Sequence, residues 1–111
     1  MELQEIVRKV NGIVVVDVPG TGATAAYSSD LLSDVMGHCD EGAVLITIQN
    51  HVNTIAVCTL VGVEVVVICH ARQVPADMAD AARREGVALV VTPLTQYEVA
   101  RALAELPPSR K

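Results

Sequence analysis

The chain has 111 residues, which is enough for one domain with a buried core and too few for two. Hydrophobic residues make up 51% and charged residues 19%, which excludes a disordered chain, and with only 2% aromatic residues the core must be aliphatic. The formal net charge of -5 argues against a nucleic-acid partner, because such binding relies on clustered Lys and Arg.

Neither a signal peptide nor a membrane span is expected. Residues 1–5 are acidic and amphipathic, without a basic start or an apolar core. The most apolar passage, residues 55–69, contains Gly62 and Glu64 and is shorter than the ~20 residues that cross a bilayer. Three cysteines do not form a complete disulfide set, so reduced thiols and a cytoplasmic location are expected.

Apolar residues recur at helical spacing over residues 2–11, and β-branched residues dominate residues 13–18, so a helix and then a strand are predicted. The following loop contains Gly20-x-Gly22-x-x-Ala25, which imitates a dinucleotide-binding fingerprint. That fingerprint needs a helix starting at its second Gly and an acidic residue after the next strand, and a P-loop needs a Lys. The chain has none of these, so an ordinary turn is favoured and no cofactor is expected.

A second helix is predicted after Ser29 or Asp30, either of which could cap its start. The apolar run at residues 45–49 is typical of a parallel strand covered on both faces. Asn53 is a good N-cap for a third, very apolar helix, which Gly62 ends.

The second half of the chain repeats the alternation. Residues 63–69 and 87–91 are predicted as strands. Between them, Pro75 suits the first position of a fourth helix that stops at Gly86.

The last helix has the clearest local signal. Thr95 and Glu98 have the spacing of a capping box, and Pro107-Pro108 ends the helix. Residues 107–111 are expected to be a frayed tail.

Strands alternating with helices from residue 13 onward predict right-handed crossovers and a mostly parallel sheet with helices on both faces. We therefore expect residues 1–111 to form a single three-layer α/β/α domain. The first strand could be antiparallel or lie at an edge.

Five short stretches are shared with a known family: SDLLSDVM at 29–36, LITIQNHVN at 45–53, GVAL at 86–89, VTPL at 91–94 and YEV at 97–99. Through them the chain resembles, from about residue 27 to residue 106, a DRTGG domain, a family related to the N-terminal domain of HPr kinase/phosphorylase. The resemblance implies an HPr kinase N-terminal-domain-like fold. It also implies a regulatory or interaction domain, commonly self-associating, rather than an enzyme.

The motif that names this family is not retained. Its Asp-Arg would correspond to Asn50-His51, and its Thr-Gly-Gly to Cys69-His70-Ala71. A ligand inferred from the family's best-known members therefore does not transfer.

Polar side chains gather where two predicted strands end, which is where open α/β sheets bind ligands. If the strands are neighbours, their spacing of about 4.8 Å brings the two loops within side-chain reach. The alternative is that these residues only close turns or cap a helix. The candidate ligand-binding residues are Asn50, His51, Asn53, Cys69 and His70.

The spacing of the histidines and cysteines does not favour a metal site. Zinc sites use closely spaced ligand pairs, whereas the pairs here are adjacent residues whose side chains point in different directions. The candidate ligands were His38, Cys39, His51, Cys69 and His70.

Cys69 with His70 and Arg72 could form a thiol nucleophile, but the loop is too short for a phosphatase-like cradle, so a buried thiol is favoured. No catalytic residue is assigned. The favoured function is a non-catalytic, homodimeric regulatory domain that binds a nucleotide, another phosphate-bearing molecule or a protein partner. The alternative is a small enzyme of phosphotransfer or thiol type using Cys69, His70 and His51.

Overall fold

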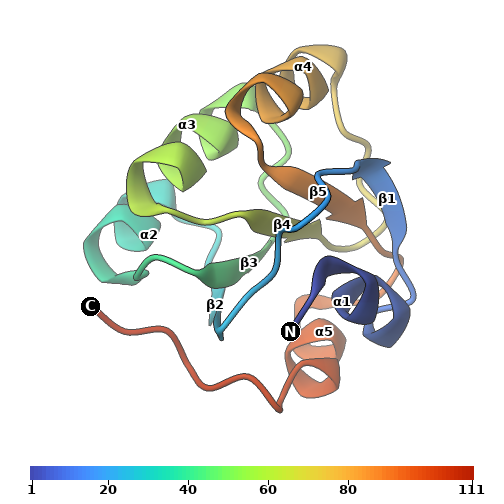
Figure 1. The fold of residues 1–111 in the computed structure, drawn as a ribbon, viewed down its shortest axis with the longest axis vertical. Helices are drawn as coiled ribbons and strands as arrows, with labels where there is room; N and C mark the ends of the chain where they lie inside the picture. Colours follow the sequence, from blue (N-terminus) through green and yellow to red (C-terminus); the bar gives the residue numbers. More distant parts are fainter.

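The computed structural model describes residues 1–111, in which five strands and five helices form one α/β domain (Figure 1). The helices are α1 (Leu3–Lys9), α2 (Leu32–His38), α3 (Val52–Val61), α4 (Ala76–Glu85) and α5 (Gln96–Ala102). The strands are β1 (Ile13–Val16), β2 (Ala25–Ser28), β3 (Ala43–Thr47), β4 (Val65–Ile68) and β5 (Ala88–Val91). None of the helices combines the length and the apolar character needed to cross a bilayer.

The five strands form one sheet in the order β1-β5-β4-β3-β2. β2, β3, β4 and β5 are parallel, and β1 runs antiparallel to β5 at one edge. The predicted mostly parallel sheet is therefore confirmed, and the first strand is both antiparallel and at an edge. This topology brings the carboxyl ends of β2, β3, β4 and β5 to the same edge of the sheet.

Helices cover both faces of the sheet, as the sequence predicts (Figure 1). Leu45 of β3 points to the layer formed by α2, α3 and α4, where it belongs to the same core cluster as Ile55. Its neighbour Ile46 points to the other face, where it shares a cluster with Ile6 of α1 and Leu103 of α5. The central strands are continuously apolar because both of their faces are buried.

β2 was not predicted from the sequence, because Ala25 and Ala26 are small and no apolar run surrounds them. It forms because both of its edges are paired. One edge lies parallel to β3, and on the other edge the N–H of Ala26 donates to the carbonyl of Pro107 at 2.9 Å and the N–H of Ser109 donates to the carbonyl of Ala26 at 2.9 Å.

The expectation of a frayed tail at residues 107–111 is therefore corrected. Ser109 is buried, and its Oγ accepts a hydrogen bond from the N–H of Asp40 at 2.9 Å. Lys111 reaches the end of α2, where its N–H donates to the carbonyl of His38 at 3.1 Å. The tail protects the edge strand β2, which would otherwise present unpaired backbone groups.

Two helix starts differ from the sequence prediction by one or two residues. α3 begins at Val52 with His51 as its N-cap, so Asn53 lies inside the first turn and its predicted capping role is wrong. α4 begins at Ala76, and Pro75 is the N-cap rather than the first helical residue. At the start of α5 the predicted capping box is present.

Candidate functional site

The loops that follow β3 and β4 lie side by side at the carboxyl edge of the sheet. β3 and β4 are paired neighbours, with Thr47 opposite Ile68 at their ends. The condition on which the predicted site depended is therefore met. Asn50 and His51 lie three and four residues beyond the end of β3, and His70 and Arg72 lie in the loop after β4.

Asn50 ties the two loops together. Its amide Nδ2 donates to the carbonyl of Gln73 at 2.7 Å, and its Oδ1 accepts from Nη2 of Arg72 at 3.1 Å. Both polar atoms of this half-buried side chain are thus used within the protein. Asn50 holds the exposed Arg72 guanidinium at the edge of the sheet, a role that the sequence did not predict.

α3 begins at this same edge without a side-chain cap. His51 is exposed, and the N–H groups of Val52 and Asn53 donate to no protein acceptor. The first turn of the helix contains no acidic residue. The positive end of the helix dipole therefore faces solvent beside Arg72, which gives this edge the properties of an anion-binding surface.

His70 and Ala71 occupy left-handed backbone conformations, with φ angles of 63° and 54°. Their N–H groups donate to the carbonyls of Leu94 at 2.9 Å and Thr92 at 2.8 Å, which fixes the loop to the end of β5. A non-glycine residue pays about 1–2 kcal/mol for this conformation. The resemblance placed the family's Gly-Gly at these two positions, and the backbone explains that choice of residue.

The backbone of His70 joins the loop after β4 to Leu94, just before α5. The carboxyl of Glu98 has a lowered pKa, chiefly because it accepts the backbone N–H of Thr95 and bonds the Thr95 side chain. The positive charge of Arg101 contributes to the same lowering. The side chain of His70 makes no hydrogen bond, and the contacts that join the β3 and β4 loops come from Asn50 and Arg72.

Cys69 does not face the edge. It is fully buried in the core cluster beneath α1 and α5, and burial raises the pKa of its thiol to about 11. A nucleophilic cysteine must be both ionised and accessible, and Cys69 is neither at neutral pH. The structure therefore removes it from the group of side chains available to a ligand and leaves the thiol-enzyme alternative without its nucleophile.

Asp30, which the sequence suggested only as a possible helix cap, is the most heavily bonded side chain of this edge. Its Oδ1 accepts from the hydroxyl of Thr47 at 3.0 Å, the N–H of Ile48 at 2.9 Å and the amide of Gln96 at 2.9 Å. Its carbonyl accepts from the amide of Gln49 at 2.6 Å. One carboxylate therefore connects the end of β2 to β3 and α5.

Asp30 could have been found only by recognising β2. With that strand assigned, Asp30 becomes an acidic residue just beyond the carboxyl end of a parallel strand, the position at which α/β folds place functional groups. Neither Ser29 nor Asp30 caps α2, whose N-cap is Leu31.

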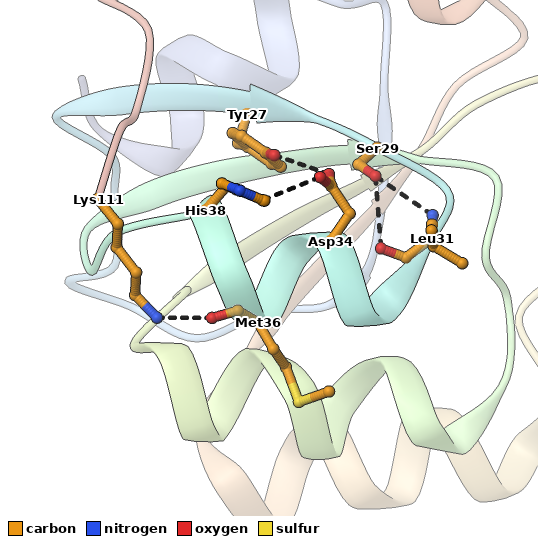
Figure 2. Close-up of polar contacts among 7 residues, drawn as sticks. All are labelled: Tyr27, Ser29, Leu31, Asp34, Met36, His38 and Lys111. Atoms are coloured by element: carbon orange, nitrogen blue, oxygen red, sulfur yellow. Dashed lines mark hydrogen bonds and ion pairs between the residues drawn. The ribbon is translucent and has the colours of Figure 1, made fainter.

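A second polar cluster lies on α2 (Figure 2). Tyr27 donates to Oδ2 of Asp34 at 2.7 Å, and Nδ1 of His38 lies 3.1 Å from Oδ1 of the same carboxylate. The hydrogen bond to Asp34 raises the pKa of Tyr27 to about 12, and the same bond lowers the pKa of Asp34.

A carboxylate that orients an imidazole in this way also occurs in catalytic triads. A triad needs a free nucleophile, and the neighbouring Ser29 hydroxyl instead bonds the backbone of Leu31, accepting its N–H at 3.2 Å (Figure 2). The Tyr27–Asp34–His38 cluster therefore fastens α2 to β2.

The histidines and cysteines that were considered as metal ligands do not come together. No group of three or more His, Cys, Asp or Glu side chains is placed to hold a metal ion.

Two hollows, of about 290 and 430 Å³, lie at the opposite, amino edge of the sheet. Acidic residues line them, namely Glu2 and Asp17 in the first and Glu41, Glu64 and Glu85 in the second.

No protein-family profile matches this chain, and no curated protein is significantly similar to it. Among solved structures, the chain is similar to the CBS and DRTGG domains of the regulatory region of Clostridium perfringens pyrophosphatase, complexed with its activator, diadenosine tetraphosphate. The TM-score is 0.74 at 13% identity, over 96% of this chain and 47% of that one. This chain therefore spans about half the length of its structural neighbour, and the likeness shows a DRTGG-related α/β fold.

Proposed function

We propose that this chain is a non-catalytic regulatory domain of the HPr kinase N-terminal-like type, which binds a phosphate-bearing small molecule and works as a homodimer. The observation that carries the proposal is the Arg72 guanidinium, held by Asn50 beside the uncapped start of α3. A fixed guanidinium next to free helix N–H groups is the arrangement that proteins use for phosphate.

The predicted ligand residues take different roles in this proposal. His51 and the first turn of α3, including Asn53, offer donors to the ligand, and Arg72 supplies its charge. Asn50 acts by positioning Arg72. His70 lies in the same loop, two residues before Arg72.

The pyrophosphatase regulatory region supports the choice of ligand chemistry. That protein is complexed with a dinucleoside polyphosphate activator, and its fold extends over nearly the whole of this chain. A nucleotide or polyphosphate is therefore the first class of ligand to test here. A protein partner that presents a phosphate would use the same groups.

A regulatory role fits this edge better than catalysis. General acid–base or nucleophilic catalysis needs two reactive groups within hydrogen-bonding reach of each other. Cys69 is buried and protonated, and Asp30 is bonded to Thr47, Ile48 and Gln96. The remaining groups of this edge bind and orient an anion.

The test is a thermal-shift and calorimetry screen with pyrophosphate, ATP and diadenosine tetraphosphate, at an ionic strength matched with NaCl. A ligand that binds only the folded chain raises the melting temperature. Arg72→Gln keeps a polar amide but shortens the side chain and removes its charge, so we expect it to abolish the shift.

Arg83→Gln is the matched control, because Arg83 is exposed on α4 and bonds Asp80 there. This variant should bind as the unmodified chain does. The proposal is contradicted if no phosphate-bearing compound stabilises the protein, or if Arg72→Gln and Arg83→Gln behave alike.

A further inference from the structure

α3 is largely apolar, although one side faces solvent. The helix contains no charged residue, and it packs between α2 and α4 in the middle of its layer (Figure 1). Val52, Ala56 and Leu60 lie one turn apart on its outer face, where Leu60 is 73% and Val52 38% exposed. Solvent-facing helix surfaces usually carry charged residues, so an exposed face without any, with Val52 and Leu60 on it, indicates a contact with another molecule.

We propose that the outer face of α3 joins two copies of this chain, with their α3 helices antiparallel about a two-fold axis at Ala56. This inference rests on the proposed homodimer and gives it a location. The stripe is self-complementary, because a two-fold axis at Ala56 sets Val52 against the partner's Leu60. The small Ala56 side chain meets its own copy at the axis, where it lets the two backbones approach closely.

The polar residues of the same face have matching positions. The axis at Ala56 also sets Asn53 opposite the partner's Thr59. The Thr59 hydroxyl donates to the carbonyl of Ile55 at 3.0 Å, so its oxygen remains free to accept from the Asn53 amide. Each apolar pair is therefore flanked by a pair that can form a hydrogen bond.

A groove beside this stripe provides space for a projecting side chain. It lies between α3 and α4 and has a volume of about 320 Å³; the small residues Ala56 and Ala81 border it, and Arg84 and Glu85 line its α4 side. Val52 lines the end of the groove that the partner's Leu60 would reach. A protruding leucine on one copy thus meets a hollow on the other, as an isologous contact requires.

Charges at the two ends of α3 favour an antiparallel second copy. The amino end carries the positive end of the helix dipole and the nearby Arg72. The carboxyl end carries Glu64 and Glu41. Glu41 lies against Gly62, the C-cap of α3, since a Cβ added to that glycine would be 2.8 Å from the Cβ of Glu41. An antiparallel pair sets each basic end against an acidic one, whereas a parallel pair opposes like charges.

A dimer interface needs only a small part of the surface of this chain. A stable interface buries about 800 Å² on each copy, which is about one seventh of the 5552 Å² surface of this chain. Met36 on α2, which is 39% exposed, extends the apolar surface beyond α3.

Sedimentation velocity and light scattering at micromolar concentration provide the first test. We expect the unmodified chain to be a dimer and Leu60→Glu to be a folded monomer, with a dissociation constant raised roughly 30-fold or more. Ile13→Glu is the matched control, because Ile13 is similarly exposed at 69% but lies on β1. This control should remain dimeric, and thermal melts verify that both variants are folded.

Cross-linking tests the arrangement itself. Ala56→Cys should form a disulfide-linked dimer on mild oxidation, and a mixture of Val52→Cys and Leu60→Cys should cross-link while Leu60→Cys alone should not. The native cysteines are buried and do not interfere.

The outcomes separate this inference from the proposed function. A dimer that persists in Leu60→Glu overturns the α3 interface and leaves the homodimer in place. A monomeric unmodified chain overturns both the interface and the dimer, while phosphate binding at Arg72 is judged by its own assay.

Discussion

Removing the Asp30 carboxylate should destabilise the domain by about 2–4 kcal/mol. Asp30→Ala takes the acceptor from the Thr47 hydroxyl, the Ile48 N–H and the Gln96 amide. Thr47 is fully buried, whereas Ile48 and Gln96 are only half-buried and can reach water after the change. A buried donor that loses its partner costs about 1–3 kcal/mol, and the two half-buried donors add less each.

Urea unfolding followed by circular dichroism measures this cost, since the chain has no Trp for fluorescence. Asp30→Asn keeps an oxygen at the accepting position and loses only the charge, so it should cost about 1 kcal/mol. Asp80→Ala is the surface control, because Asp80 only pairs with exposed Arg83, and its cost should stay below about 0.5 kcal/mol. Equal costs for Asp30→Ala and Asp80→Ala would refute the view that Asp30 joins β2, β3 and α5.

Three further predictions concern the backbone and the buried thiols. Gly62→Ala should reduce the free energy of unfolding by about 1 kcal/mol more than Gly86→Ala. Both glycines have a positive φ, 93° at Gly62 and 73° at Gly86. Only at Gly62 would the added Cβ meet another atom, the Cβ of Glu41 at 2.8 Å. Ala71→Gly should stabilise the chain by about 0.5–1 kcal/mol, because it relieves a φ of 54°; urea unfolding checks all three variants. Burial raises the pKa of Cys58 from 9.0 to about 12 and that of Cys69 from 9.0 to about 11. The folded chain therefore favours the protonated thiols. This contribution to the free energy of unfolding is present below pH 9 and is lost as the pH rises towards 11–12. Unfolding free energies that stay constant from pH 8 to pH 11 would contradict this assignment.

The elements built on strong local signals were predictable from the sequence. The capping box at Thr95 and Glu98 depends only on two residues that are three positions apart in the chain, and it is present where the sequence predicted it. The central strands were equally clear, because residues covered on both faces must all be apolar. The mostly parallel sheet followed from the alternation of such strands with helices.

The features that escaped the sequence analysis depend on contacts between distant segments. β2 is short and begins with two alanines. Its outer edge forms backbone hydrogen bonds with Pro107 and Ser109, about 80 residues away in the chain. Asp30 gained its role only because β2 ends beside β3 and α5. Asn53 was an acceptable N-cap by residue type, but the N-cap of α3 is His51, two residues earlier, and the helix begins at Val52.

Both proposals meet at α3, and together they predict that ligand binding and dimerisation are coupled. The amino end of α3 borders the Arg72 site, and in the antiparallel pair it also faces the partner's acidic end. A phosphate bound there neutralises the charge that attracts the partner's Glu41 and Glu64, so the ligand should weaken the dimer. By linkage, dimerisation should weaken ligand binding by the same factor.

Sedimentation with and without pyrophosphate measures this coupling. We expect the dissociation constant of the dimer to rise when pyrophosphate binds and to be unaffected by NaCl of equal ionic strength. In Glu64→Gln the rise should be smaller, because one of the repelled carboxylates is absent. A dimer that tightens on binding pyrophosphate would show that the phosphate bridges the two copies instead, and would require the partner's acidic end to lie away from the Arg72 site.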